Sequence, residues 1–360
     1  MNEFETQLDY PLGEALPEPG TSLAVAEDVR WVRMPLPFQL NHINLWLLRD
    51  AIEGVQGWTI VDCGIDDAAT RGAWAAVFRS ELQGLPVLRV IVTHMHPDHM
   101  GLADWLTRHW SGERRECRLW ASATDYSAAR MASTSLTSIG GPRTAEFLAR
   151  HGLSDPGVLD KVRARSNYYA TMVPRVPECY RRLMHGMAVS IGGRTWTCRA
   201  GYGHAPEHMA LHCAELGTLI SGDMILPRIS TNVSVHEFEP EADPLMLYLD
   251  SIQQLRALPA PTLVLPSHGR PFVGLHTRID QLHAHHAARL KDAVDACSVA
   301  PRSAHDLLGV LFKRSFGLHE TTFAMGEAIA HLNALWLDGT LSRVVDARGV
   351  FRFAAPAPSP

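Results

Sequence analysis

The 360-residue chain lacks the features that mark several classes of protein. No apolar run approaches the length of a transmembrane helix, so we expect no membrane span. The first 20 residues are acidic and rich in proline and glycine, without the basic start and apolar stretch of a secretory signal. The six cysteines show no C-x-x-C spacing. Together these absences predict a cytoplasmic protein with reduced thiols.

An excess of positive charge is also missing. The chain carries 33 Lys and Arg against 38 Asp and Glu, a formal net charge of −5. That balance argues against binding to polyanions through bulk charge. Hydrophobic residues make up 46% of the chain, which is enough for a sizeable core.

The pattern of strands and helices predicts one large domain and one small one. We predict a flexible tail at 1–20, a main domain at 21–277 and a C-terminal domain at 278–354. Short strand-like runs recur through the main domain, and a helix-rich stretch at 127–187 interrupts them as an insertion. The C-terminal pattern of three helices and then a hairpin is the order of a winged helix.

A dense run of ligand-type side chains, HMHPDH, follows directly after a buried, strand-like segment. Alternate residues of a loop can point the same way, so His94 and His96 can share one metal ion. Asp98 and His99 can then turn towards a second ion. Imidazole and carboxylate are the ligands of hydrolytic zinc, manganese and iron(II) sites. The run therefore predicts a metal site.

Three further candidates, His204, Asp223 and His268, each follow a predicted strand. Taken alone, a side chain of this kind is more often a satisfied structural polar group. In this order, downstream of HMHPDH, the three indicate a dinuclear site. His208 lies close to His204 in the chain and is a candidate for supporting the ligands or contacting substrate.

The ordered set H-x-H-x-D-H…H…D…H resembles the metallo-β-lactamase superfamily, and specifically its dinuclear, glyoxalase II-like hydrolases. The resemblance covers roughly residues 25–275 and implies an α+β fold, the four-layer αββα sandwich. With the helical insertion and the small C-terminal winged-helix-like domain, the layout looks like the lactamase-β-like subgroup.

The resemblance also implies two divalent metal ions, with zinc favoured over manganese or iron. It assigns three ligands to the first ion, three to the second and one bridging carboxylate: His94, His96 and His204; Asp98, His99 and His268; and Asp223. Asp62, in the segment VDCG, would support the histidine loop from behind. Asp98 would in addition be the catalytic residue that orients and deprotonates the attacking water.

From this site we predict a metal-dependent hydrolase. A metal-bridging hydroxide would cleave a carbonyl substrate, namely a thioester, an ester or a lactone. The motif leaves the substrate open. Three alternatives remain: an endoribonuclease of the lactamase-β-like type, a persulfide dioxygenase with a mononuclear iron, and a non-catalytic domain stabilised by metal.

The insertion bears on the choice of substrate. Residues 127–195 carry ten Lys and Arg against four acids, which favours an anionic small molecule such as an acyl-coenzyme A. Tyr168 and Tyr169 in this stretch, and Arg228 beyond it, are our candidates for substrate contacts.

The C-terminal domain shows no basic stripe, so we expect no nucleic-acid partner. The apolar pattern of its helices favours packing on the main domain or a homodimer. His283, His285 and His286 lie on one predicted helix, and we expect them to face solvent.

Overall fold

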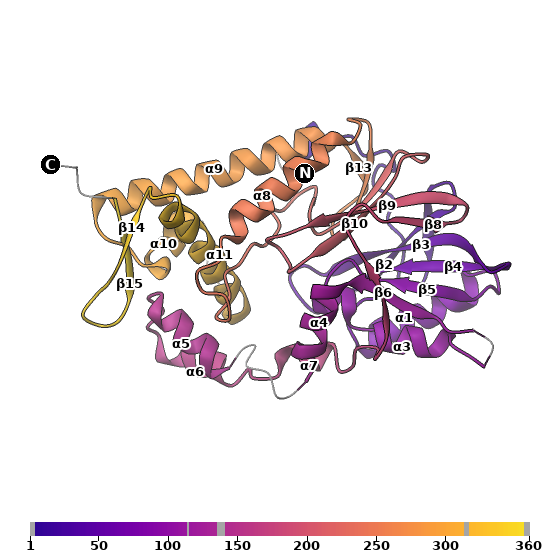
Figure 1. Ribbon diagram of the computed structural model, residues 1–360, viewed down its shortest axis with the longest axis horizontal. Helices are drawn as coiled ribbons and strands as arrows, with labels where there is room; N and C mark the ends of the chain where they lie inside the picture. Colours follow the sequence, from indigo (N-terminus) through magenta and orange to yellow (C-terminus); the bar gives the residue numbers. More distant parts are fainter. Residues whose placement is uncertain (1–3, 114, 135–140, 313–316, 356–360) are drawn as a thin grey trace. The chain divides into compact units, whose positions relative to one another are not determined.

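The fold is that of a computed structural model, which describes residues 4–113, 115–134, 141–312 and 317–355 (Figure 1). Residues 1–3 of the predicted tail, 135–140 of the predicted insertion and 313–316 of the predicted C-terminal domain lie outside the described residues. The chain divides into two compact units. The first comprises Met1–Thr134, Tyr169–Thr231 and Ser251–Ile279, and the second Ser135–Tyr168, Asn232–Asp250 and Asp280–Pro360. The predicted insertion at 127–187 is thus divided between them.

Two β-sheets make up most of the first unit. The first sheet has seven strands in the order β1 (Ser22–Ala26), β2 (Val29–Pro35), β3 (His42–Ile52), β4 (Val55–Val61), β5 (Val87–Ile91), β6 (Arg118–Ser122) and β7 (Tyr180–Leu183). The second has six, in the order β13 (Phe272–Val273), β12 (Leu263–Pro266), β11 (Thr218–Gly222), β10 (His208–Cys213), β9 (Arg194–Gly201) and β8 (Ala188–Ile191). The predicted α+β class is confirmed.

The two sheets bury a shared core between them. Trp31 of β2 and Trp46 of β3 stack at 6.3 Å between ring centroids, and they belong to the same buried cluster as Trp196 and Ile220 of the second sheet. All five residues of β5 are buried, which is typical of a strand covered on both faces.

Helices α1 (Ala68–Ser80) and α3 (Ala103–Trp110) pack on the other side of the first sheet. Their apolar side chains, Trp74, Val77 and Leu106 among them, join a second buried cluster with that sheet's strands. The remaining helices of the unit are short: η1 (Glu5–Gln7), α2 (Pro97–Met100), α4 (Ala123–Ala132) and η2 (Leu255–Ala257).

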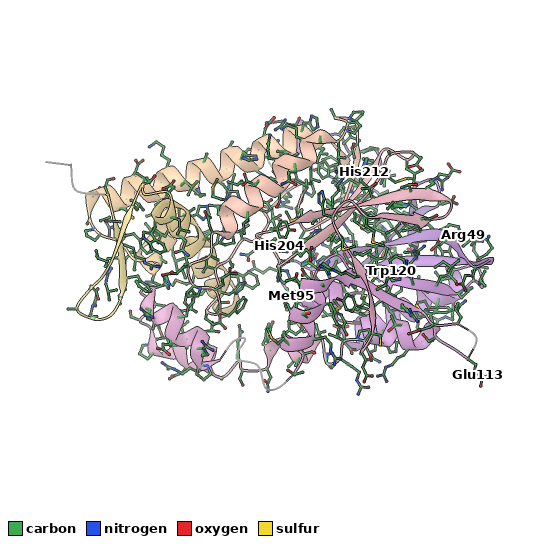
Figure 2. All side chains as sticks on the ribbon, viewed as in Figure 1. Arg49, Met95, Glu113, Trp120, His204 and His212 are labelled. Atoms are coloured by element: carbon green, nitrogen blue, oxygen red, sulfur yellow. The ribbon has the colours of Figure 1, made fainter. Side chains whose placement is uncertain are left out.

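A buried ion pair lies within the first sheet. The Arg89 guanidinium contacts the Asp50 carboxylate at 2.6 Å, with 5% and 1% of the two side chains exposed. Arg89 and Arg181 also lie over the ring of Trp120, at 4.7 and 4.5 Å from its centroid (Trp120 is labelled in Figure 2).

The N-terminal residues differ from the flexible tail that we predicted for 1–20. The backbones of Asp9 and Val273 exchange two hydrogen bonds, of 3.0 and 2.8 Å. Tyr10 lies against Phe272, and the guanidinium of Arg270 lies over the Tyr10 ring at 4.3 Å. Because β13 is an edge strand, its unpaired backbone groups provide the partners for this segment.

The second unit is mainly helical. It contains α5 (Pro142–Arg150), α6 (Pro156–Arg163), α10 (Ala304–Leu311), α11 (Leu318–Leu337) and the hairpin β14 (Ser342–Val345) and β15 (Phe351–Ala354), while α7 (Tyr168–Met172), α8 (Pro244–Gln254) and α9 (Leu275–Val299) have residues in both units. The predicted order of three helices and a hairpin is present as α9, α10, α11 and β14–β15. The winged-helix assignment stays a prediction.

His286 corrects one of our expectations, because its side chain is buried rather than facing solvent. Its Nδ1 lies 3.3 Å from Nε2 of His331, which is also buried. The pattern of α9 did not reveal this, because the partner lies 45 residues away on α11.

Among the helices of the described ranges, none has both the length and the apolar character of a bilayer span.

Candidate metal centre

The loop after β5 carries four of the predicted ligands. It leads into α2, a single short turn whose first residue is Pro97 and which places Asp98 and His99 side by side in sequence. Proline suits this position, because its fixed φ is that of a helix and its missing N–H has no partner there in any helix. His94 and His99 are fully buried, and His96 is half-buried.

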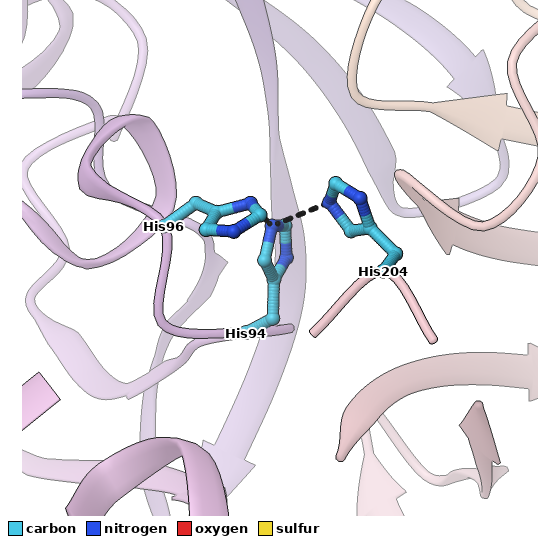
Figure 3. A group of neighbouring side chains, drawn as sticks. All are labelled: His94, His96 and His204. Carbon is cyan, nitrogen blue, oxygen red and sulfur yellow. Dashed lines mark hydrogen bonds between the residues drawn. The ribbon is translucent and has the colours of Figure 1, made fainter. Parts of the chain in front are cut away.

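His94, His96 and His204 form the first group (Figure 3). Nε2 of His94 lies 2.9 Å from Nδ1 of His96 and 3.2 Å from Nε2 of His204. Three imidazole nitrogens thus converge on one point, from the β5 loop of the first sheet and the loop between β9 and β10 of the second.

Asp98, His99 and His268 form the second group. Oδ2 of Asp98 lies 3.7 Å from Nε2 of His99 and 3.4 Å from Nε2 of His268. His268 follows β12, as predicted, and its Nδ1 lies 2.8 Å from the backbone oxygen of His42.

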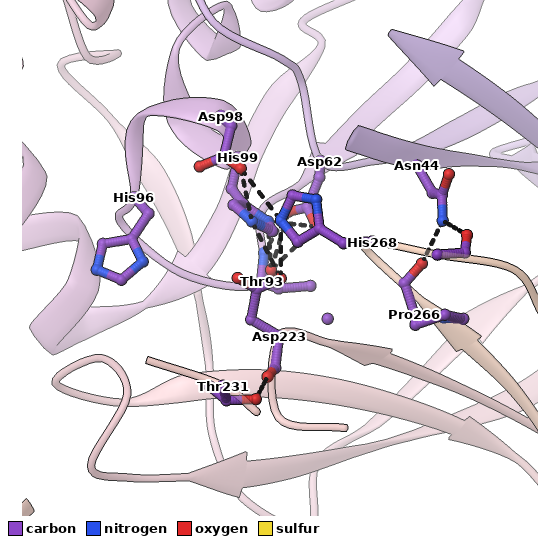
Figure 4. Close-up of polar contacts among 12 residues, drawn as sticks. Asn44, Asp62, Thr93, His96, Asp98, His99, Asp223, Thr231, Pro266 and His268 are labelled. Carbon is purple, nitrogen blue, oxygen red and sulfur yellow. Dashed lines mark hydrogen bonds and ion pairs between the residues drawn. The ribbon is translucent and has the colours of Figure 1, made fainter. Parts of the chain in front are cut away.

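The carboxylate of Asp223 faces both groups. Figure 4 shows it with His99 and His268 of the second group. Its Oδ2 lies 3.4 Å from Nε2 of His204, and its Oδ1 lies 3.5 Å from Nε2 of both His99 and His268. His208 accepts a hydrogen bond from the Asp223 backbone N–H at its Nε2, 3.2 Å away.

Asp62 supports the histidine loop through contacts with Thr93 and His99. Its Oδ1 accepts the Thr93 N–H at 2.8 Å, and its Oδ2 lies 2.9 Å from Nδ1 of His99. The Asp62 side chain is fully buried, and its φ of +64° is a left-handed conformation that aspartate tolerates better than most residues. A carboxylate on Nδ1 leaves Nε2 of His99 as the free ligand atom.

The donor set fits divalent cations. Nε2 of His99 and Oδ1 of Asp223 are buried and make no hydrogen bond within the described part of the chain. Buried polar atoms are normally paired, so buried lone-pair atoms that face one another without a hydrogen bond fit the ligands of a cation.

The electrostatics point the same way. Burial lowers the pKa of His96 to about 3, so this imidazole is neutral and can donate a lone pair. For His268, burial lowers the pKa, but the charges of Asp223 and Asp98 outweigh it and raise the pKa to about 10. In the metal-free chain a proton on His268 therefore balances the carboxylates. A cation would take over that role and release the proton.

The comparisons with known families agree with this geometry. The family described as "Metallo-beta-lactamase superfamily" matches residues 40–268, more than half of the chain. The chain belongs to the metallo-beta-lactamase superfamily. A second family, "Metallo-beta-lactamase-like, C-terminal domain", matches residues 290–356 of this superfamily member. The superfamily fold implies divalent metal ions, which the two groups of side chains fit.

Individual relatives of this metallo-beta-lactamase superfamily protein cover nearly its whole length. The chain is 23% identical to the "Probable metallo-hydrolase YqjP" of Bacillus subtilis (strain 168) over 341 residues, which are 90% of this chain and 97% of the relative. Among solved structures, a beta-lactamase domain protein from Burkholderia ambifaria is 53% identical, with a TM-score of 0.93 over 99% of this chain and 100% of that one. A metallo-beta-lactamase family protein from Thermus thermophilus is 26% identical, with a TM-score of 0.75 over 92% and 100%.

The three tentative substrate contacts do not join the two groups. The Arg228 side chain is 69% exposed and lies 3.9 Å from the Glu5 carboxylate. The guanidinium of Arg165 lies over the ring of Tyr168, 5.1 Å from the centroid of that ring. The Tyr169 hydroxyl donates a hydrogen bond of 2.5 Å to the backbone oxygen of Met95. Their roles towards substrate stay predictions.

Two further sets of supporting residues went unnoticed in the sequence. Asp125, on α4, accepts hydrogen bonds from the backbones of Met95 and Glu207. Asn44, on β3, donates to the backbone oxygens of Pro266 and Gly269, on either side of His268 (Figure 4 shows Asn44 and Pro266). These contacts use backbone atoms far away in the sequence, so no local motif announces them.

Proposed function

We propose that the protein hydrolyses a carbonyl substrate, a thioester, ester or lactone, at a dinuclear metal site, with zinc as the favoured metal. The observation that carries this proposal is the position of Asp223, one carboxylate that faces the two groups of ligands from its two oxygens. A carboxylate that faces both groups in this way would be able to serve two ions rather than one.

The ions would supply the electrophile and the nucleophile. Two divalent ions bound here would polarise the substrate oxygen and lower the pKa of a shared water from ~15.7 towards ~7. The chain's own residues do the rest. His94, His96 and His204 offer three converging imidazole nitrogens, and Asp62 fixes the ring of His99 through its Nδ1.

Asp98 is the proposed proton acceptor. The charges of His99 and His268 hold its pKa at about 2 although burial raises it, so it is ionised at neutral pH. Its side chain is 18% exposed, against 11% for Asp223, which leaves it the more accessible carboxylate for an attacking water. An ionised carboxylate beside that water orients it and takes its proton.

The arginines of the predicted insertion lend little support to an anionic substrate, because several already have partners. Arg130 donates to a backbone oxygen at 3.0 Å, Arg163 pairs with Asp160 at 2.6 Å, and Arg165 lies over Tyr168. Exposed helical charges of this kind are commonly solvated pairs. The two groups of candidate ligands therefore carry the proposed function, and the charge of the substrate stays open.

A substrate screen tests the proposal. Purified protein would be assayed with acyl-coenzyme A thioesters, lactones, single-stranded RNA, and a persulfide in an oxygen electrode. Turnover of a thioester or lactone without RNA cleavage is the expected result. Cleavage of RNA would replace the proposal with an endoribonuclease, and oxygen consumption with the persulfide would replace it with a dioxygenase.

A pair of variants ties the activity to the site. Asp98→Asn keeps the size of the side chain and removes the proton acceptor, so it should abolish turnover while the fold remains intact. Asp104→Asn is the matched control, since Asp104 pairs with Arg108 on α3 and is not part of either group. Full activity of the Asp98 variant, or equal losses in both, would contradict the proposed role.

A further inference from the structure

The carboxylate of Asp125 joins the two loops that carry the first group of histidines. One of its oxygens, Oδ1, accepts the Met95 N–H at 2.8 Å, and the other, Oδ2, accepts the Glu207 N–H at 2.6 Å. Met95 stands between His94 and His96, and Glu207 follows His204 by three residues. The Asp125 side chain is almost fully buried, so water does not compete for these bonds.

The position of Asp125 in its helix makes this use of the carboxylate unusual. Asp125 is the third residue of α4, and the helix is capped by Ser122, whose hydroxyl accepts the Asp125 N–H. An acid at this position commonly reaches back to the backbone N–H of the capping residue. In α10 the corresponding Asp306 does so, at 2.9 Å from the N–H of Ser303.

Asp125 instead directs both oxygens to the loops outside its helix. It hydrogen-bonds the capping residue only through the Ser122 hydroxyl, at 3.2 Å. The same peptide region is also held from its other side, because the Tyr169 hydroxyl donates to the oxygen of Met95. The segment between His94 and His96 is therefore fixed at both its N–H and its C=O.

The second group has a separate anchor. The Nδ2 amide of Asn44 donates to the oxygens of Pro266 and Gly269 at 2.8 and 2.7 Å, and the backbone oxygen of His42 accepts from Nδ1 of His268. These contacts come from β3 in the first sheet and reach across to the second. Each group of ligands is thus supported by its own set of hydrogen bonds.

We propose that Asp125 is a positioning residue which sets the distance between the His94–His96 loop and the His204 loop, and thereby the affinity for the first ion alone. The inference rests on the proposed function, because it takes these three histidines as ligands of one ion. A residue that orients ligands from behind typically changes metal affinity by about 10- to 100-fold.

Zinc binding by the metal-free, full-length protein tests this inference. The chain would be stripped with a chelator and titrated with Zn²⁺ against a competing chromogenic chelator. Asp125→Asn keeps the volume but replaces one accepting oxygen by a donor, so one backbone N–H loses its acceptor. We expect one of the two zinc equivalents to bind about 10- to 100-fold more weakly and the other to keep its affinity within about threefold.

Two backgrounds identify the affected ion. In a His268→Ala background, which leaves the first group intact, Asp125→Asn should weaken the remaining zinc. In a His204→Ala background, which leaves the second group intact, the same change should have no effect. Asp306→Asn is the matched control, an equivalent change at the same position of α10, and it should leave both affinities unchanged.

The outcomes separate the inference from the proposed function. Equal weakening of both ions, or no weakening, would overturn the positioning role while the dinuclear site stands. Failure of the unaltered protein to bind zinc would overturn the proposed function and this inference with it. If Asp125→Asn does not fold, Tyr169→Phe takes its place, since it removes one hydrogen bond from the same loop, and it should weaken the first ion by about 2- to 10-fold.

Discussion

The replacement of Asp62 by asparagine is a sharp test of how the histidine loop is held. Asparagine has nearly the same volume as aspartate and also tolerates the left-handed φ of +64° at this position. The variant therefore changes hydrogen bonding without adding backbone strain or leaving a cavity.

The size of the effect follows from the two oxygens of Asp62. One accepts the Thr93 N–H at 2.8 Å and the other faces Nδ1 of His99 at 2.9 Å. An amide has a single oxygen, so in either orientation its NH₂ group meets one of these donors. Where it meets His99, the ring must carry its proton on Nε2, the atom that faces Asp98 and Asp223.

A proton on Nε2 competes directly with the second ion. Replacing the residue that hydrogen-bonds the second ring nitrogen of a ligand histidine lowers metal affinity by about 10- to 100-fold. This factor corresponds to about 1.4 to 2.7 kcal/mol. We therefore expect Asp62→Asn to weaken one zinc equivalent by this factor, as measured by competition with a chelator.

Asp67→Asn is the matched control for this prediction. Asp67 caps α1 by accepting the Thr70 N–H at 2.7 Å, and asparagine caps a helix equally well. This variant should keep both zinc affinities. If Asp62→Asn also kept both, the idea that Asp62 fixes the proton of His99 would be refuted.

Three further predictions concern stability, each measured by urea unfolding. Gly222→Ala should cost about 2–4 kcal/mol, because a Cβ would lie 2.1 Å from Nε2 of His208 at a φ of +54°; a neutral result would contradict the packing described here. Arg89→Met should cost about 3–5 kcal/mol because the buried Asp50 carboxylate loses its cationic partner and keeps only neutral donors, yet the protein should still bind two zinc ions; a loss below about 1 kcal/mol would contradict the role of this ion pair. Burial lowers the pKa of His286 to about 2, so the unfolded chain takes up a proton below pH ~6.5 that the folded chain does not, and stability falls as the pH drops. His286→Leu should therefore gain about 2 kcal/mol relative to the unaltered protein between pH 8 and pH 5, and an unchanged difference would show that this residue is not the acid-sensitive group.

The sequence alone predicted the ligand groups because their signal is local. His94, His96, Asp98 and His99 share one short loop directly after a buried strand, and the structure brings them together with the three candidates that follow later strands. The short strand-like runs predicted individual strands, and the resemblance to the metallo-β-lactamase superfamily implied the two-sheet sandwich.

The supporting residues could not be predicted in the same way. Asp125 acts on backbone groups 30 and 82 residues away, and Asn44 on oxygens 222 and 225 residues away. A backbone N–H or C=O has no residue identity, so the sequence carries no trace of these pairings.

The expectations for His286 and for the N-terminal segment failed for the same physical reason. His286 looked like one of several solvent-facing histidines on a helix, but α11 covers it with His331. The N-terminal segment looked like a loose tail, but the edge of the second sheet gives Asp9 a backbone partner. Tertiary contacts, rather than local pattern, decided both cases.

The number of metal ions that each chain binds decides whether the site is dinuclear. The protein would be dialysed to equilibrium against zinc, and its zinc and protein contents determined by elemental and amino-acid analysis. We expect two ions per chain, falling to about one in His204→Ala and in His268→Ala. Full hydrolytic turnover with one ion or fewer per chain would contradict it.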